Sequence, residues 1–130
     1  MMDVSYDAVE ADFDQLVLAR SQTVLVLLDI GAQWCSPCRV MGPMLERLAE
    51  QYQGKFLLAK VDADENMRIA GRHHVKGFPT IIGYSHGLGI GRFHGAQTES
   101  FVRRFIDDLI KRHAAECAGT AMRSGITLVA

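Results

Sequence analysis

The feature that most constrains this 130-residue chain is a pair of cysteines, Cys35 and Cys38, directly after an apolar run. The run 23–30 is typical of a buried strand, and the residues after the cysteines have the apolar period of a helix. A Cys-X-X-Cys pair at such a junction is a redox centre more often than a metal site. A helix N-terminus, with its unpaired amides and partial positive charge, stabilises a thiolate. We therefore predict Cys35 at the first turn, accessible to solvent, and Cys38 one turn deeper and more enclosed.

Composition and charge fit one soluble globular domain. Hydrophobic residues make up 48% of the chain and the formal net charge is −1, so nothing favours nucleic acid or an anionic membrane as a partner. Two of the three cysteines belong to the motif, which excludes a disulfide framework. The first residues lack the pattern of a secretory signal, and the longest apolar run, 24–28, is too short to span a bilayer. These features predict a cytoplasmic protein without a membrane segment.

The spacing of apolar residues predicts alternating strands and helices. Strands are expected over 23–29, 56–61, 80–84 and 89–93, and helices over about 8–20, from the cysteines to Gly54, over 64–72 and over 98–113. Asp7 and Glu10 have the spacing of a capping box for the first helix. Pro43 is expected to kink the second. This order predicts an α/β fold with a central mixed β-sheet flanked by helices on both faces.

Several separated segments resemble the thioredoxin family, over about residues 10–112. They are the Trp-Cys-Ser-Pro-Cys centre, Asp29 six residues before Cys35, the segment Ala59–Asp64 with Lys60, the segment Val75–Thr80 with Pro79, and the glycines Gly87 and Gly95. A lone Cys-X-X-Cys is a weak signal, whereas all of these together at the family's spacing are specific. The resemblance implies a thioredoxin fold. Residues 1–113 are expected to form the thioredoxin-like domain and 114–130 a C-terminal extension, flexible at least in part.

The resemblance also implies the activity of a protein disulfide reductase. The Cys35 thiolate would attack a disulfide of a protein substrate, and Cys38 would resolve the mixed disulfide. Asp29 lies in an apolar strand, so we expect burial to raise its pKa and let it take the proton from Cys38, with Lys60 moderating that shift. Electrons would come from a thioredoxin reductase. The family implies no cofactor and no metal, and the chain is expected to act as a monomer.

A substrate-binding surface is implied around the cysteines. Its residues would be Trp34, Ser36, Pro37, Phe78, Pro79 and Gly95. A cis peptide bond is expected before Pro79, which in the family leaves backbone groups of the preceding residue free to pair with an extended substrate. Trp34 is expected to expose its ring edge, and the alternative is a tryptophan of the core.

Four residues near this surface depart from the family pattern. Ser36 replaces a glycine, Gly31 a tryptophan, Phe78 an aliphatic residue and His94 an apolar residue. None of these changes removes a catalytic group. Each touches the site or its rim, so they bear on redox potential and on the choice of partner.

Two other functions remain open at this point. An extracytoplasmic thiol–disulfide oxidant or isomerase would need an export signal and a far less reducing dithiol. A non-catalytic chaperone or regulatory binding module would share the fold, and fold alone does not exclude it. A pure scaffold has no need of the cysteine pair together with Asp29, Lys60 and Pro79, which argues against the binding module.

A zinc site built from Cys35, Cys38, His73 and His74 is also conceivable from the residue types alone. Adjacent histidines in a strand or helix point in different directions, so the sequence favours surface histidines instead. Cys117 lies beyond the family-like region and is predicted to be a spectator thiol. The glycines of 87–91 lack the strand-to-helix context of a phosphate-binding loop and fit a hairpin.

Overall fold

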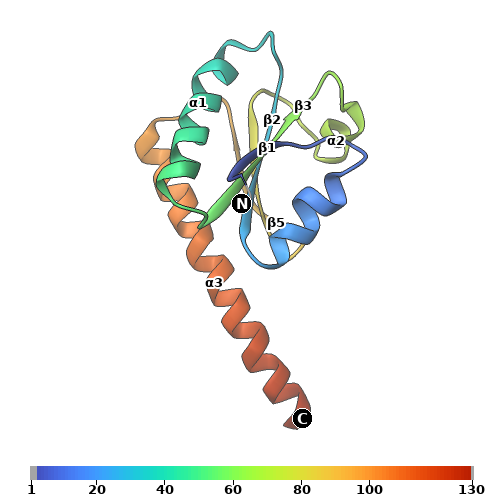
Figure 1. Ribbon diagram of the computed structural model, residues 1–130, viewed down its shortest axis with the longest axis vertical. Helices are drawn as coiled ribbons and strands as arrows, with labels where there is room; N and C mark the ends of the chain where they lie inside the picture. The colour runs from blue at the N-terminus through green and yellow to red at the C-terminus, as the bar shows by residue number, and fades with distance from the viewer. Residues whose placement is uncertain (1–2, 130) are drawn as a thin grey trace.

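A five-stranded mixed sheet forms the centre of the protein, in a computed structural model that describes residues 3–129, with side chains described to residue 117. The strand order is β1-β3-β2-β4-β5 (Figure 1). The strands are β1 (Ser5–Asp7), β2 (Leu25–Gly31), β3 (Phe56–Asp62), β4 (Thr80–Ser85) and β5 (Leu88–His94). Both β1 and β2 run parallel to β3, whereas β4 is antiparallel to β2 and β5. The predicted α/β fold with a mixed sheet is confirmed.

Helices cover both faces of the sheet (Figure 1). On one face lie α1 (Ser36–Gln51) and α3 (Glu99–Val129), and on the other lie the π-helix η1 (Asp14–Ala19) and α2 (Met67–Arg72). Side chains alternate along a strand, so β2 contributes to both cores. Leu25 and Leu27 pack with α1 and α3, whereas Val26, Leu28 and Ile30 pack with η1 and α2. This alternation places Asp29 on the α1 side.

The N-terminal segment differs from the prediction. A helix over 8–20 and a capping box were expected, but the chain forms β1 first and helical backbone begins near Asp14. The Glu10 carboxylate instead accepts a hydrogen bond of 3.0 Å from the backbone N–H of Arg68, in the first turn of α2. Three strand residues are too few for a periodic pattern, so only pairing with β3 defines β1.

The last helix is longer than predicted. The apolar stripe ends near His113, whereas α3 is 31 residues long and ends at Val129. Alanine is the best helix former, and the segment 114–129 contains four alanines and no proline, so the helix continues through Gly119 and Gly125. Figure 1 shows this segment leaving the body of the domain. Among the described residues, no helix combines the length and the apolar character needed to cross a membrane.

Two glycines bring α3 close to the sheet. A Cβ added to Gly83 in β4 would overlap Cδ1 of Leu109, and one added to Gly91 in β5 would lie 3.2 Å from Cδ2 of the same residue. Leu109 is 2% exposed, so its side chain fills the space that these glycines leave. This contact fixes the height of α3 above β4 and β5.

Candidate active site

The two motif cysteines lie where β2 gives way to α1. Cys35 is the N-cap of α1, and Cys35 and Cys38 are joined as a disulfide, with their Cα atoms 5.3 Å apart. The backbone N–H of Cys38 donates a hydrogen bond of 3.2 Å to Sγ of Cys35. Pro37 lies in the first turn, where no intrahelical amide is needed. The end of α1 therefore presents an amide donor and its positive pole to the Cys35 sulfur.

Exposure of the two cysteines differs from the prediction. Cys35 is 4% exposed in the disulfide form, whereas Cys38 is half-buried, so Cys38 is not the more enclosed of the two. Sγ of Cys38 lies over Gly31, where a Cβ would be 3.3 Å away. The first turn of α1 was expected to be open to solvent, but Cys35 is buried at its start. Cys35 therefore differs from Cys38 by its position at the N-terminus of α1, and not by greater exposure to solvent.

Asp29 is a buried acid beneath the cysteines. It is 9% exposed, and its Oδ1 has no hydrogen-bond partner among the described residues. Burial raises the pKa of Asp29 to about 6, while the positive charge of Lys60 lowers it and the negative charge of Glu46 raises it. The carboxyl group therefore changes protonation close to neutral pH, where a group that accepts and returns a proton is most effective.

Lys60 is the cross-strand neighbour of Asp29, since the two are paired in the register of β2 and β3. Its Nζ donates a hydrogen bond to Oε1 of Glu46 on α1, and this bond raises the pKa of Lys60. Glu46 was not singled out from the sequence. It follows Cys38 by eight residues, which places both on one side of the helix. That spacing is the sequence signal from which Glu46 could have been found. Asp29 thus has two charged neighbours of opposite sign, Lys60 and Glu46.

Gly31 opens a pocket of about 220 Å³ beside Asp29. Its lining includes Asp29, Gly31 and Lys60. Sγ of Cys38 and Oδ1 of Asp29 both lie within 4 Å of the point where a Cβ of Gly31 would stand. Because Gly31 has no side chain, water from this pocket can reach the space between the sulfur and the carboxyl group.

Trp34 is exposed over the active site, so the alternative of a core tryptophan is wrong. Its side chain is 62% exposed, and Nε1 donates a hydrogen bond of 2.8 Å to Oδ2 of Asp64. The indole also meets the ring of Phe78 edge to face, with centroids 5.5 Å apart. The sequence pattern after β3 includes Asp64 but does not indicate its contact with Trp34, which only the fold creates. The two rings form an aromatic rim beside the disulfide.

The loop before β4 completes this surface. The peptide bond between Phe78 and Pro79 is cis. The backbone N–H of Gly95 donates a hydrogen bond of 2.9 Å to the carbonyl of Pro79, and Oγ1 of Thr80 donates one of 2.7 Å to the carbonyl of Gly77. Within the part of the chain that the structure describes, no hydrogen bond engages the backbone N–H or C=O of Phe78. Those two groups are available to a partner.

The histidines do not join the cysteines. Nδ1 of His73 is 2.6 Å from the carbonyl of Ile69, and Nε2 is 2.6 Å from the hydroxyl of Tyr84. Both ring nitrogens are therefore engaged, so we discard the zinc site that combined His73 with the motif cysteines. His94 is exposed on β5.

Comparisons with known proteins agree with this geometry. The family model described as Thioredoxin matches residues 4–108. A thioredoxin of Chlorobaculum thiosulfatiphilum is 34% identical over 105 residues, which are 81% of this chain and 95% of the relative. A thioredoxin of Staphylococcus aureus is 36% identical over 98 residues, 75% of this chain and 90% of the relative. Mouse mitochondrial thioredoxin is 35% identical over 99 residues, 76% of this chain and 58% of the relative.

A mixed sheet with a cysteine pair at the N-terminus of a helix defines a redox protein of the α/β class. The family model matches residues 4–108, and the Chlorobaculum relative is covered over 95% of its length. The chain therefore belongs to the thioredoxin family. Its homologues are thiol–disulfide oxidoreductases, and so is this protein.

Proposed function

We propose that this protein is a protein disulfide reductase of thioredoxin type, with Cys35 as the attacking thiol and Cys38 as the resolving thiol. The observation that carries the proposal is the position of the Cys35 sulfur, which caps α1 and accepts the amide of Cys38 at 3.2 Å. In the reduced protein the same amide stabilises a thiolate at this position. Among the described residues no donor bonds the sulfur of Cys38, which lies next to Gly31.

In the proposed reaction the Cys35 thiolate attacks one sulfur of a substrate disulfide. A mixed disulfide forms, and the other substrate sulfur leaves as a thiolate. Cys38 then loses its proton and attacks Sγ of Cys35, which forms the Cys35–Cys38 disulfide and releases the second substrate thiol. Two electrons pass to the substrate, and the protein ends in the oxidised state seen in the structure.

Asp29 is the proposed acceptor of the Cys38 proton. Its pKa of about 6 and its place beside the pocket at Gly31 support transfer through a water molecule. Burial is the main cause of that raised pKa, which the charge of Lys60 lowers and the charge of Glu46 raises. When the protein is reduced again, the carboxyl group returns the proton to Cys38. We thus assign proton transfer to Asp29, and to Lys60 the adjustment of the pKa of Asp29.

Substrate is proposed to bind as an added strand along the free backbone groups of Phe78. The aromatic rim of Trp34 and Phe78 supplies apolar contact on one side. The other proposed contacts are Ser36 and Pro37, both exposed in the first turn of α1, with Pro79 and Gly95. Main-chain pairing demands little of the substrate sequence, as a general reductase requires.

The partners and setting follow from this function. We propose a thioredoxin reductase as the electron donor, a monomeric protein, and a reducing compartment such as the cytoplasm. The catalytic domain is proposed as residues 1–113, since the family match ends at residue 108, and residues 114–130 as an extension of it. No cofactor is invoked, because the dithiol itself carries both electrons.

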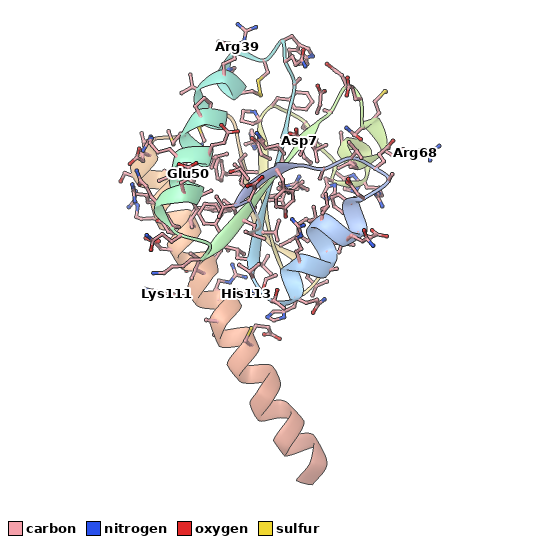
Figure 2. The ribbon with its side chains drawn as sticks, viewed as in Figure 1. Asp7, Arg39, Glu50, Arg68, Lys111 and His113 are labelled. Atoms are coloured by element: carbon pink, nitrogen blue, oxygen red, sulfur yellow. A yellow bond between two sulfur atoms is a disulfide. The ribbon has the colours of Figure 1, made fainter. Side chains whose placement is uncertain are left out.

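The oxidant or isomerase remains the competing activity, and the redox potential separates it from the reductase. A strongly oxidising pair keeps a very acidic thiolate, with a pKa near about 3.5. The nearest basic residue in the sequence is Arg39, which directly follows the motif, and Figure 2 shows its side chain beyond the N-terminal end of α1. Its guanidinium is exposed, so solvent ions screen its charge, and it donates a hydrogen bond of 3.3 Å to the carbonyl of Gln33. The Arg39 charge therefore adds little to the stabilisation that the amide at the start of α1 gives the Cys35 thiolate. This supports a reducing dithiol.

The test is equilibration of the protein with glutathione, in a Cys117→Ser background so that only Cys35 and Cys38 titrate. We expect a potential within some tens of millivolts of about −270 mV, the value of thioredoxin. Turnover by a thioredoxin reductase and reduction of a protein disulfide should accompany it. A potential above about −200 mV, or no turnover with the reductase, would overturn the proposal in favour of the oxidant or the binding module.

A further inference from the structure

A second cluster of sulfur and nitrogen ligands lies away from the redox cysteines. His86 is in the β4–β5 turn, whereas His113 and Cys117 lie one turn apart on α3. One ligand atom from each residue lies within 4.8 Å of the other two. Sγ of Cys117 is 3.3 Å from Nε2 of His86 and 3.9 Å from Nε2 of His113. Among the described side chains, this is the group of histidine, cysteine and acidic residues placed to hold a metal ion.

We propose that His86, His113 and Cys117 form a binding site for a divalent zinc-type metal ion. Zinc prefers imidazole nitrogen at about 2.0–2.1 Å and thiolate sulfur at about 2.3 Å in a tetrahedral arrangement. Nitrogen and sulfur ligands of such an ion stand about 3.5 Å from each other. The two sulfur–nitrogen distances already lie on either side of that separation. The rings of His86 and His113 are stacked, with centroids 4.5 Å apart and planes 11° apart. Because an imidazole lone pair lies in the plane of its ring, binding requires the His86 ring to turn so that its Nε2 points at the ion held by His113 and Cys117.

His113 is oriented for this role by its other nitrogen. The residue is 8% exposed, and Nδ1 lies 2.6 Å from Oγ of Ser85. A hydrogen bond at Nδ1 fixes the ring and leaves Nε2 as the ligand, which is the usual arrangement of metal-binding histidines. Figure 2 shows His113 on the side of α3 that faces the domain, just before the helix leaves it.

His86 is held in an unusual backbone conformation. Its φ is 53°, followed by Gly87 at φ 80°, so the turn has two residues in the left-handed region. Both amides of this turn bond Ser21: His86 N–H donates to its carbonyl at 2.7 Å and Gly87 N–H to its hydroxyl at 2.8 Å. A residue other than glycine in this region carries strain and persists only where the surroundings impose it. Ser21 thereby keeps the imidazole beside α3.

The third ligand completes the site and leaves one position open. Cys117 is exposed, so its thiol can lose a proton to solvent when the metal binds. A pocket of about 230 Å³, lined in part by Ser85 and His86, lies next to the cluster. Three protein ligands with an adjacent pocket leave the fourth coordination position to water or a small molecule.

The site is separate from the redox centre. β4 begins beside Pro79 and ends beside His86, so its six residues place the two sites about 20 Å apart. A bound ion would join the turn to α3 and hold Cys117 as a thiolate ligand. This inference depends on neither Cys35 nor Cys38.

The test is cobalt(II) titration of the purified protein in a Cys35→Ser/Cys38→Ser background, where Cys117 is the only thiol. We expect one equivalent of cobalt per chain, with the thiolate-to-cobalt charge-transfer band and the visible bands of a tetrahedral site. Zinc should displace the cobalt. The absence of a thiolate band, or one metal ion per two chains, would overturn the proposal.

Variants assign the ligands. Cys117→Ser should abolish the charge-transfer band. His86→Asn should weaken binding by more than the about 10- to 100-fold loss expected for Ser85→Ala, which removes only a hydrogen-bond partner of a ligand. His74→Asn is the matched control, because His74 has the same φ of 53° in an exposed turn outside the cluster. Equal binding by the Cys117→Ser variant, or equal losses in the His86→Asn and His74→Asn variants, would refute the site.

Discussion

Replacing Asp29 by asparagine is expected to change how the free energy of unfolding depends on pH. The pKa of Asp29 is about 6 in the folded protein, against an ordinary value of 3.8. Each pKa unit corresponds to about 1.36 kcal/mol, so the buried charge destabilises the fold by about 3 kcal/mol at neutral pH. Asparagine has nearly the same volume and carries no charge, so this penalty is absent in the variant.

The sign follows from proton binding. Between about pH 4 and pH 6 the folded state holds a proton on Asp29 that the unfolded state has released, so the stability of the wild-type protein falls as the pH rises. The Asp29→Asn variant lacks this dependence. Its stability relative to wild type should therefore increase by about 2.4 kcal/mol between pH 4 and pH 7, whatever the offset in acid.

Urea denaturation of the oxidised proteins at half-unit steps of pH measures this difference. Asp7→Asn is the matched control, because Asp7 lines the same pocket but its side chain is exposed. Figure 2 shows Asp7, which is the last residue of the edge strand β1. A stability difference between Asp29→Asn and wild type that does not vary from pH 4 to pH 7 would refute the assignment of a desolvated carboxyl group. The same would follow if Asp7→Asn gave an equal pH-dependent gain.

Three further predictions concern the site and its support. Cys38→Ser should accumulate mixed disulfides with proteins and Cys35→Ser should not, as seen on non-reducing gels; faster alkylation of Cys38 than of Cys35 would reverse the roles. Lys60→Met should raise the pKa of Asp29 above about 6, because the lysine charge that lowers it is lost while the Glu46 charge that raises it remains; an unchanged or lower pKa in carboxyl NMR shifts would refute this. Gly83→Ala should destabilise the fold by about 1–3 kcal/mol through overpacking, measured by urea denaturation, and an unchanged midpoint would show that α3 adjusts freely.

Local patterns predicted the elements on which the site depends. The apolar runs of β2 and β3 are long enough to be recognised without tertiary information, although β2 begins two residues later than expected. Pro37 and the apolar period after Cys38 likewise predicted α1. The kink at Pro43 stays a prediction. The resemblance placed Asp29 and Lys60 together, and strand pairing does so in the structure.

Contacts between segments far apart in the chain could not be predicted from local sequence patterns. The burial of Cys35 is a property of the folded domain, and the Glu10 contact with α2 joins residues 58 apart. Cys117 lies beyond the family-like region, so the sequence predicts a spectator thiol, and its neighbour His86 is 31 residues away along the chain. A cluster assembled from a turn and a helix has no spacing of its own. Only the fold brings such residues together.

The contact between Leu109 and Gly83 also holds α3 at one point on the sheet, so that a tilt of the helix about this contact displaces the residues beyond it. His113 lies four residues beyond Leu109 and Cys117 eight residues beyond it, about 6 Å and about 12 Å along the helix axis. A tilt of about 10° at the contact with Gly83 would move Cys117 by about 2 Å, enough to separate it from the turn that holds His86. A larger residue at position 83 would therefore change the distance between the Cys117 thiol and His86. We expect the effects of substitutions at Gly83 and Cys117 on this distance to be coupled.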